Sequence, residues 1–501
     1  PGAGAGGVAP GAPARAQSSA PDPSATVSIA ARTVGQPIRP GFLGFSIEFQ
    51  AVRVYTGSDP GAINPVLVSL IRNLTPGQAP VLRIGGDSTD VSFVPTPGVR
   101  APAYVSYKLT PGWMATTAAL QRALNARMIL GVNLAANEPR LAAAEVSAYL
   151  RTFGRGSIEA LEIGNEPNVY GKITVYHTVF GLPIAARPKS FGYPAFHAQF
   201  DAIAARTAAA PLAGPALAVG PTPGPGSWVQ TMPSFLRREP RLGIMTIHRY
   251  PLRNCYVPPR SVQYPSVSHL LSPYAAAGLA RSLRRWIGIA HRQGRHLRVD
   301  ELNSVACRGK AGVSDRFASA LWVTDALFAL ARAGVDGVNV HTLPDSAYEL
   351  FQFGRRDGHW YGTVRPVYYG LQLFAQAAPA GSRLLAVSQR GHTSALSTWA
   401  TRAADGRVRI VLINKDPAAG RTVTVRLPAG SATTATVERM QAPSVTASRG
   451  VTLGGHGYGQ ATSTGQLAPP HLSTISAAHG SLNVSVPHGS AALVTVDAPA
   501  A

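Results

Sequence analysis

The stretch "LEIGNEPNVY", residues 161–170, joins a short apolar run to an abrupt polar turn. The run ends at Asn165 and Glu166, and Pro167 follows at once. A continuous apolar run of this length is typical of a strand that is buried on both faces. Because proline restricts its own φ and the residue before it, the direction of the Glu166 side chain is restricted too. A carboxylate in this position is a candidate functional group.

The same pattern recurs along the first three quarters of the chain. Eight apolar runs stand at residues 42–49, 81–86, 128–134, 161–165, 217–220, 243–250, 296–301 and 335–341. Helix-like stretches separate them, such as "RLAAAEVSAYLRTFG" and "RFASALWVTDALFALARAG", which close on glycine as helices often do. This alternation predicts a (β/α)8 TIM barrel, of the α/β class, over residues 35–380. The alternative is a doubly wound sheet, but no G-x-G-x-x-G follows the first run.

The texture of the sequence changes after residue 380. Short β-branched runs separated by Gly, Pro, Asn and Asp predict a C-terminal antiparallel β-sandwich over residues 381–501. Residues 25–34 have the same texture, so we expect this early strand to join the sandwich. Residues 1–24 contain almost nothing that could form a core and are predicted to be a flexible tail.

The charge balance is strongly basic. The chain has 46 Lys and Arg against 24 Asp and Glu, a formal net charge of +22. Attraction to a polyanion is one interpretation, and codon bias together with solubility is the other. The second is favoured because the sequence has no dense basic run and no nucleic-acid-binding motif. The sequence also lacks an apolar run of 18 residues, so no membrane span is expected.

In a barrel of this type the active site lies where the strands end. The residues at or just after the ends of the runs are polar: Glu48, Asp87, Asn133, Asn165, Glu166, His248, Tyr250, Glu301, Asn339 and His341. Each one alone has a simpler explanation as a helix cap or a solvated strand end. Their agreement on one rim of the barrel predicts a site there.

Two carboxylates on this rim indicate a particular chemistry. Glycoside hydrolysis uses a pair of carboxyl groups that flank the scissile bond, and Glu166 and Glu301 follow the fourth and seventh runs. A separation of about 5–5.5 Å accompanies retention of the anomeric configuration, and about 6.5–9.5 Å accompanies inversion. The alternative roles are a first-turn helix acid for Glu166 and a surface ion pair for Glu301.

These residues amount to a resemblance. The stretches "FLGFSIEF", "VLRIGGDSTD", "GNEPN", "IHRYPL", "DELNS", "DSAYEL" and the C-terminal "VTLGGHGYG" resemble glycoside hydrolase family 79, which contains β-glucuronidases and heparanases. "GNEPN" is shared by many retaining families of the same clan, whereas the combination is specific to this family. The resemblance covers nearly the whole chain except the tail.

The resemblance implies roles for individual residues. Glu166 would be the acid/base and Glu301 the nucleophile, while Glu48, Asp87, Asn165 and Tyr250 would line the sugar pocket. Asn133 and His248, near the ends of the third and sixth runs, are further candidates for binding substrate. A glucuronate carboxylate would meet the Tyr348 hydroxyl and backbone amides near Cys307 and Arg308. Heparanase-like members of the family have a Gly-rich loop where this chain has "VACRGKAG". The alternative role of Tyr348 is packing, and the alternative role of His248 is to orient Glu301.

The two cysteines follow neighbouring strands. Cys255 comes a few residues after the sixth run and Cys307 a few residues after the seventh, so we expect a disulfide between these loops. The bridge would imply an oxidising compartment, secreted or periplasmic. The alternative is two buried thiols.

The sequence therefore predicts a retaining exo-β-glucuronidase that needs no metal and no cofactor and acts on a glucuronide-containing glycoside or oligosaccharide. Three alternatives remain open: a β-glucosidase or β-xylosidase of the same clan, an endo-acting heparanase-like hydrolase, and a non-catalytic protein that binds acidic polysaccharide.

Overall fold

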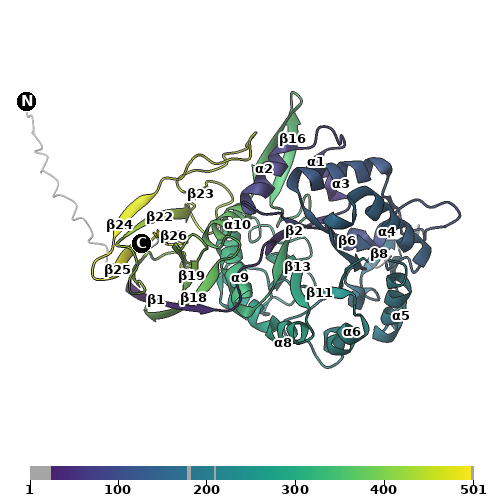
Figure 1. Ribbon diagram of the computed structural model, residues 1–501, viewed down its shortest axis with the longest axis horizontal. Helices are drawn as coiled ribbons and strands as arrows, with labels where there is room; N and C mark the ends of the chain where they lie inside the picture. Colours follow the sequence, from purple (N-terminus) through teal and green to yellow (C-terminus); the bar gives the residue numbers. More distant parts are fainter. Residues whose placement is uncertain (1–23, 178–181, 208–209, 498–501) are drawn as a thin grey trace, which may run out of the picture.

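The computed structural model describes residues 24–177, 182–207 and 210–497. The predicted tail, apart from Ser24, and residues 178–181 of the insertion after the fourth run lie outside these ranges. Figure 1 shows two bodies side by side, a barrel wrapped by helices and a β-domain at the N- and C-terminal ends of the chain. In the described residues no helix is long and apolar enough to cross a membrane.

Eight parallel strands in the described ranges close into a barrel. They are β2 (Leu43–Glu48), β3 (Val81–Gly85), β6 (Arg127–Val132), β7 (Ile158–Ile163), β10 (Leu212–Ala218), β11 (Leu242–His248), β13 (His296–Leu302) and β15 (Gly337–Thr342). The eight predicted runs all overlap these strands. The fifth run meets only the last two residues of β10, because Gly214 and Pro215 interrupt the strand pattern and hide the strand's start.

Helices cover the outside of the barrel. The main ones are α2 (Pro65–Leu74), α3 (Pro111–Leu124), α4 (Pro139–Phe153), α5 (Tyr193–Ala204), α6 (Met232–Arg238), α8 (Leu279–Arg292), α9 (Ala318–Ala333) and α10 (Pro366–Ala377). Sequence signals explain several of their boundaries. Asn64 accepts from two N–H groups at the start of α2, and α9 ends on Gly334 at φ +97°.

Ten strands of the described chain form the second sheet. They are β1 (Ser24–Val34), β18 (Arg383–Gly391), β19 (Leu396–Arg402), β20 (Val408–Asn414), β21 (Arg421–Arg426), β22 (Thr434–Gln441), β23 (Thr452–Leu453), β24 (Ser473–Ser476), β25 (Ser481–Val486) and β26 (Ser490–Val496). The sheet folds over its own apolar core, which includes Val27, Ile410 and Val494. The N-terminal β1 lies between β18 and β21, and its pairing with β21 is parallel rather than antiparallel.

The two bodies meet along α9 and α10 (Figure 1). Asp325 on α9 accepts hydrogen bonds from Trp399 Nε1 at 2.8 Å and from Lys415 Nζ at 2.9 Å, both from the β-domain. Phe328 stacks on Trp399 with ring centroids 5.6 Å apart. This contact holds the β-domain against the barrel wall.

Candidate active site

The carboxyl ends of the barrel strands bring the two predicted catalytic glutamates together. Glu166 follows β7, Glu301 lies near the end of β13, and His248 ends β11 between them. One oxygen of Glu166, one oxygen of Glu301 and a ring nitrogen of His248 all lie within 4.8 Å of one another. The pair is therefore close enough to act on one bond.

Glu166 occupies an unusual backbone conformation. Its φ of 49° and ψ of 48° are left-handed, which costs energy for a residue other than glycine. The conformation is held because the Glu166 N–H donates to the carbonyl of Ala216 at 3.0 Å. His248 Nδ1 lies 2.9 Å from Glu166 Oε1, and the side chain remains 19% exposed, open to the pocket. The strained turn aims the carboxyl group at the barrel mouth.

Glu301 is surrounded by hydrogen-bond donors and positive charge. Tyr250 donates to Oε1 at 2.8 Å, and Arg83 Nη1 donates to Oε2 at 2.8 Å. Burial opposes ionisation, but the positive charges of His341, His248 and Arg83 outweigh it and lower the Glu301 pKa to about 2. Glu301 is thus ionised at neutral pH, as a nucleophile must be.

His248 lies between the two glutamates. Its Nδ1 is 2.9 Å from Glu166 and 3.7 Å from Glu301, and its Nε2 is 3.6 Å from Asp300. Burial opposes the charged form, yet the carboxylates of Glu301 and Asp300 raise the His248 pKa well above its usual value. His248 contacts both glutamates, so its predicted place in the site holds whether it touches substrate or orients Glu301.

Arg83 holds this arrangement together from inside the barrel. Its fully buried guanidinium donates to Glu162 at 2.7 Å, to Ser46 at 3.0 Å and to Asn165 at 2.9 Å, besides Glu301. A buried charge is tolerated only when it is paired and hydrogen-bonded, and every group on Arg83 has a partner here. One residue therefore links strands β2, β3, β7 and β13 beneath the site.

Two further acids lie below Glu301. Burial raises the pKa of Glu162 to about 8, despite the nearby charge of Arg83. Asp300 is equally buried, but the charges of His248 and Arg83 and a hydrogen bond with Glu162 lower its pKa. The opposite shifts describe a protonated Glu162 that donates to an ionised Asp300, so that the pair carries one negative charge.

Three buried charged residues beneath the site do not stand at the ends of the strands, so the pattern of strand ends does not predict them. Arg83, Glu162 and Asp300 lie inside the apolar runs "VLRIGG", "LEIGN" and "HLRVDE". The signal was available, because Asp, Glu and Arg are almost never fully buried unless they are paired. A charge in the middle of a barrel strand thus indicates a partner within the barrel.

A pocket of about 240 Å³ opens beside the glutamates, and Glu48, Asp87, Asn165 and Arg308 line it. The Glu48 carboxylate is held by the N–H groups of Asp87 at 3.0 Å and Ser88 at 2.8 Å. Asn165 Nδ2 donates to Asp87 at 3.1 Å. Although Asp87 reaches the pocket, loss of water around its carboxyl raises its pKa, and Glu48 and Glu166 raise it further.

Asp90 and Tyr170 also line this pocket and were not predicted. Tyr170 donates to Asp90 Oδ2 at 2.6 Å, and the Asn165 N–H donates to the same oxygen at 3.2 Å. Burial raises the Asp90 pKa to about 6. Tyr170 lies within the opening stretch of the sequence, where its hydroxyl fixes the turn that carries Asn165 and Glu166.

The position of Asn133 differs from the prediction that it lines the substrate pocket. Its Nδ2 donates to the carbonyl of Ser92 at 2.8 Å, and its Oδ1 accepts from the N–H of Ala136 at 2.8 Å. The side chain is 1% exposed and does not reach the pocket. Asn133 shapes the loop after β6, and its position does not support a role in binding substrate.

Two residues predicted to bind a glucuronate carboxylate, Tyr348 and Arg308, lie on neighbouring segments at the same barrel mouth. The Tyr348 ring lies 6.3 Å from that of Tyr250 and 5.8 Å from that of His341, measured between centroids. Burial and the negative charge of Glu301 raise the Tyr348 pKa well above its usual value, so the hydroxyl keeps its proton. Arg308 is exposed and lines the pocket.

The predicted disulfide is present. Cys255 and Cys307 are bridged, with Cα atoms 6.1 Å apart, across the parallel pair β12 (Leu252–Arg253) and β14 (Val305–Ala306). Cys307 and Arg308 both have positive φ, at 64° and 65°. With its sulfur in the bridge, Cys307 has only its backbone to offer a ligand.

Two groups of side chains at this site lie close enough together to hold a cation, but a protein side chain already supplies positive charge to both. Glu166, His248 and Glu301 form one possible cation cluster, and Glu162, His248 and Asp300 form another. Arg83 contacts carboxylates of both clusters and fills them with positive charge. The site therefore suits acid–base and nucleophilic chemistry by carboxyl groups.

Comparisons with known proteins agree with this geometry. Residues 398–493 match the Glycosyl hydrolase family 79 C-terminal beta domain. Among solved structures, a 4-O-α-L-rhamnosyl-β-D-glucuronidase from Fusarium oxysporum 12S aligns with a TM-score of 0.73 at 17% identity, covering 93% of this chain and 100% of that one. An arabinofuranosidase of family 51 from Xanthomonas axonopodis pv. citri aligns at 0.68, with 14% identity and 95% and 100% coverage. A search of curated proteins finds no match.

At sequence identities of 14–17%, the likeness to these structures shows the fold of the chain, a barrel joined to a β-domain, and no more. Together with the recognised C-terminal domain, the fold defines the protein as a glycoside hydrolase. It is consistent with family 79 in particular, as the sequence motifs indicated.

Proposed function

We propose that the protein is a retaining exo-β-glucuronidase. The observation that carries the proposal is the paired carboxyl groups of Glu166 and Glu301, whose nearest oxygens lie within 4.8 Å in different surroundings. This spacing suits the about 5–5.5 Å of retaining enzymes and is too short for the water that inverting enzymes place between their carboxyl groups.

In the first step Glu301 attacks the anomeric carbon and forms a covalent glycosyl-enzyme. Its low pKa and the hydrogen bonds from Tyr250 and Arg83 keep it ionised and aligned. Glu166 donates a proton to the departing glycosidic oxygen. In the second step Glu166, now ionised, takes a proton from the water that attacks the same carbon and releases Glu301.

The pocket suits a glycone of one sugar unit. Its 240 Å³ lies below the about 300–1,000 Å³ common for drug-sized ligands, which supports removal of a terminal sugar. Glu48 and Asp87 offer acceptors for sugar hydroxyls. Arg308 offers the positive charge, and Tyr348 the hydroxyl, that a uronate carboxylate requires.

A neutral glycone is the second candidate. Three carboxyl groups, Glu48, Asp87 and Asp90, line the pocket against one arginine. This balance favours hydroxyl groups over a carboxylate and supports a β-glucosidase or β-xylosidase.

A panel of aryl β-glycosides followed by anomer-resolved NMR tests these proposals together. We expect the glucuronide to be hydrolysed fastest and the β-anomer of the free sugar to appear first. Faster turnover of the glucoside or xyloside would show that glucuronate is not the preferred glycone. Early appearance of the α-anomer would show that the enzyme inverts rather than retains the anomeric configuration. Glu301→Gln is the control for contaminating activity. Salt-sensitive retention on heparin without any hydrolysis would instead indicate a binding protein.

The disulfide supports a further part of the proposal. Bridges of this kind persist in oxidising environments, so we infer that the protein works outside the cytoplasm, in a secreted or periplasmic setting. Alkylation of cells before lysis, followed by mass spectrometry, should find Cys255 and Cys307 unmodified. Two alkylated thiols would contradict it.

A further inference from the structure

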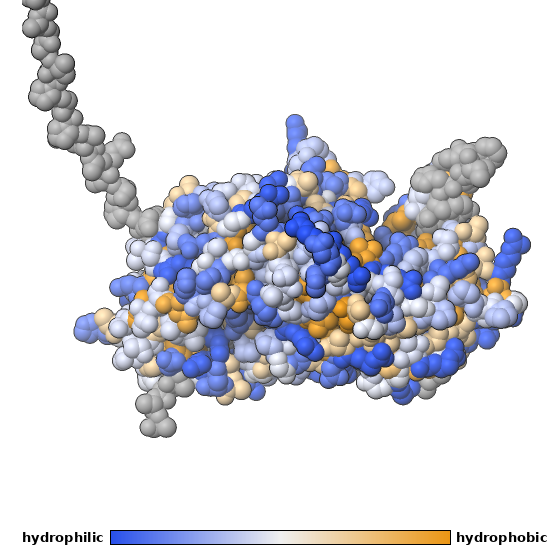
Figure 2. Space-filling view, turned by 90° about the horizontal axis from the view of Figure 1, so that it is seen from above, coloured by the Kyte–Doolittle hydropathy of each residue, from blue (hydrophilic) through white to orange (hydrophobic). Residues whose placement is uncertain are grey.

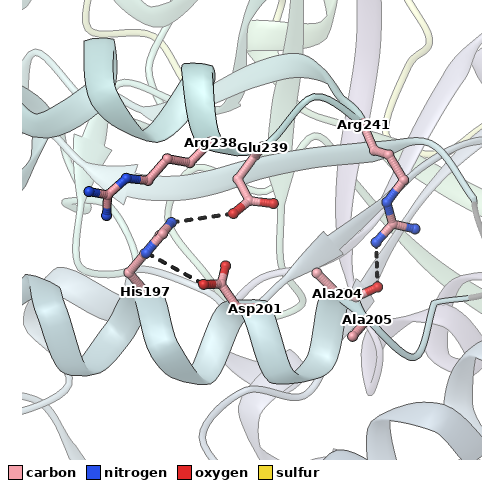
Figure 3. A pocket seen from close by; sticks show the side chains of 7 residues that line it. All are labelled: His197, Asp201, Ala204, Ala205, Arg238, Glu239 and Arg241. Carbon is pink, nitrogen blue, oxygen red and sulfur yellow. Dashed lines mark hydrogen bonds and ion pairs between the residues drawn. The ribbon is translucent and has the colours of Figure 1, made fainter.

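A second group of one histidine and two carboxyl groups lies on the outer wall of the barrel (Figure 3). His197 and Asp201 come from α5, and Glu239 follows α6 just before β11. They line a surface pocket of about 420 Å³ together with Arg238, Arg241 and the two alanines at the end of α5, Ala204 and Ala205. None of these residues takes part in the active site.

The three side chains lie close together, with the His197 ring between the two carboxyl groups. His197 and Asp201 are four residues apart on α5, so they share a face of the helix. His197 Nε2 lies 3.3 Å from Glu239 Oε1, and His197 Nδ1 lies 3.6 Å from Asp201 Oδ2. One atom from each residue fits within 4.8 Å of the other two. Ligand bonds of about 2.1 Å in a tetrahedral zinc site place neighbouring ligand atoms about 3.4 Å apart. An ion binds only one ring nitrogen of a histidine, and the 3.3 Å between His197 Nε2 and Glu239 Oε1 is close to this separation.

The histidine itself indicates a missing partner. His197 is only 9% exposed, and its buried Nε2 makes no hydrogen bond, although Glu239 Oε1 lies at ion-pair distance from it. The ring is held in place by Tyr193, stacked at 5.8 Å between centroids, and by the edge-on ring of Phe235 at 5.6 Å. Buried polar atoms are nearly always satisfied, so a fixed ring with an unsatisfied nitrogen points to a ligand.

The nearby arginines do not neutralise the two carboxyl groups. Arg241 donates to the carbonyl of Ala204 and, at 3.0 Å, to Thr207 Oγ1, which occupies it at the end of α5. In the described part of the chain neither Arg238 nor Arg241 comes within ion-pair distance of Asp201 or Glu239. In Figure 3 both guanidinium groups lie to the sides of the carboxyl pair. Since basic residues outnumber acidic ones by 46 to 24, two facing acids without an arginine partner are notable.

We propose that His197, Asp201 and Glu239 form a binding site for a divalent cation, with Zn²⁺ as the preferred ion. Imidazole nitrogen and carboxylate oxygen are both zinc ligands, the imidazole favours Zn²⁺ over Mg²⁺ or Ca²⁺, and the exposed side of the pocket leaves room for water as the fourth ligand. The ion joins α5 to the connection between α6 and β11. It therefore stabilises the outer wall of the barrel and takes no part in hydrolysis.

Calorimetric titration of the metal-stripped full chain with Zn²⁺ tests the proposal. Asp201→Asn is the informative variant, because the Asp201 side chain is 51% exposed and its change should leave the fold intact. Asp405→Asn is the matched control, since Asp405 also pairs with a residue four positions away and is 42% exposed. Loss of groups around a metal ligand already costs about 10–100-fold in affinity, so loss of a ligand should weaken binding by about 100-fold or more.

We expect wild type and Asp405→Asn to bind one equivalent of Zn²⁺ that Asp201→Asn does not bind at the same concentrations. Wild type and the control should also gain in melting temperature on adding Zn²⁺, whereas Asp201→Asn should gain less. Turnover of aryl glycosides should be unchanged in Asp201→Asn, so the outcome is independent of the proposed function. Equal zinc stoichiometry and affinity in Asp201→Asn and wild type, or no saturable binding by wild type, would overturn the proposal.

Discussion

The cluster at the barrel mouth and the cluster on the outer wall contain the same kinds of residues, one histidine and two carboxyl groups. At the mouth, Arg83 and Tyr250 donate to Glu301, and His248 contacts both glutamates. On the wall, Asp201 and Glu239 have only His197 as an ion-pair partner in the described residues. Residue types alone therefore do not decide chemistry. The positive charge supplied by the surrounding strands suits the first cluster to the proposed carboxyl-group catalysis, and its absence leaves the second cluster suited to a cation.

The largest expected effect separates the two clusters by activity. Glu301→Gln removes the proposed nucleophile and should lower kcat by about 10⁴-fold or more, while Glu166→Gln, at the proposed acid/base, should cost about 10²–10⁴-fold. Glu239→Gln, the equivalent change in the outer cluster, should leave turnover of aryl glycosides within about twofold. Steady-state kinetics on a preferred aryl glycoside measures all three. A large loss in Glu239→Gln would show that the outer cluster contributes to catalysis.

The next effect concerns stability and compares two arginines. Arg83→Met leaves the carboxyl groups of Glu162, Asp300 and Glu301 buried without their common partner, which should cost about 3–5 kcal/mol of unfolding free energy. Arg238→Met, at the exposed outer cluster, should cost less than about 0.5 kcal/mol. Urea unfolding followed by fluorescence measures both. Similar losses would mean that Arg83 is not the central partner described here.

Removing the disulfide should have a smaller effect. It should alter the cluster at the barrel mouth and leave the cluster on the outer wall unchanged. The bridged residues are 52 positions apart, and a loop of this length gives at most about 4 kcal/mol in the chain-entropy account. Cys255→Ser with Cys307→Ser should lower the melting temperature and raise KM for an aryl glucuronide, because the loop that carries Arg308 loses its tie. Zinc binding at the outer wall should not change. An unaltered KM would show that this loop does not contribute to binding the glycone.

The smallest effect, counted per pH unit, is a change in the pH dependence of stability. Burial raises the Glu162 pKa to about 8, so the folded state holds a proton that the unfolded state has lost above about pH 4.3. This group therefore makes stability fall as pH rises from about 4.3 to 8. Glu162→Gln should reduce that slope by up to about 1.4 kcal/mol per pH unit.

Asp405→Asn is the control for the pH experiment. Hydrogen bonds from Arg409 lower the Asp405 pKa, so its contribution is present above the unfolded-state value and is lost only as pH falls below about 4. The slope between pH 5 and 8, measured by urea unfolding at a series of pH values, should match wild type in this variant. An unchanged slope in Glu162→Gln would contradict a protonated Glu162 in the folded protein.

The sequence predicted the barrel because its strands are apolar throughout and its helices carry clear stop signals. It predicted the positions of Glu166 and Glu301 because parallel strands bring their carboxyl ends to one rim, and it placed Cys255 and Cys307 together for the same reason. The start of β10 was missed because Gly214 and Pro215 are uncommon in strand interiors.

The parts that were missed depend on contacts between distant strands. Asn133 has the same place at a strand end as Asn165, and only the folded loop shows that backbone groups occupy its side chain. Arg83, Glu162 and Asp300 were hidden inside apolar runs, although a charge there was itself a signal. The outer cluster joins an i, i+4 pair on α5 to Glu239, which is 38 residues further along than Asp201, so its third member needed the fold.

Trapping the covalent intermediate tests the central claim most directly. An aryl 2-deoxy-2-fluoro-β-glucuronide with a good leaving group should label the enzyme, because the fluorine slows both steps and the leaving group restores only the first. Digestion after reduction should place the added mass on the peptide of residues 299–308, and fragmentation should place it on Glu301 rather than Asp300. Labelling of any other residue, or rapid turnover of ordinary aryl glucuronide by Glu301→Gln, would contradict the account.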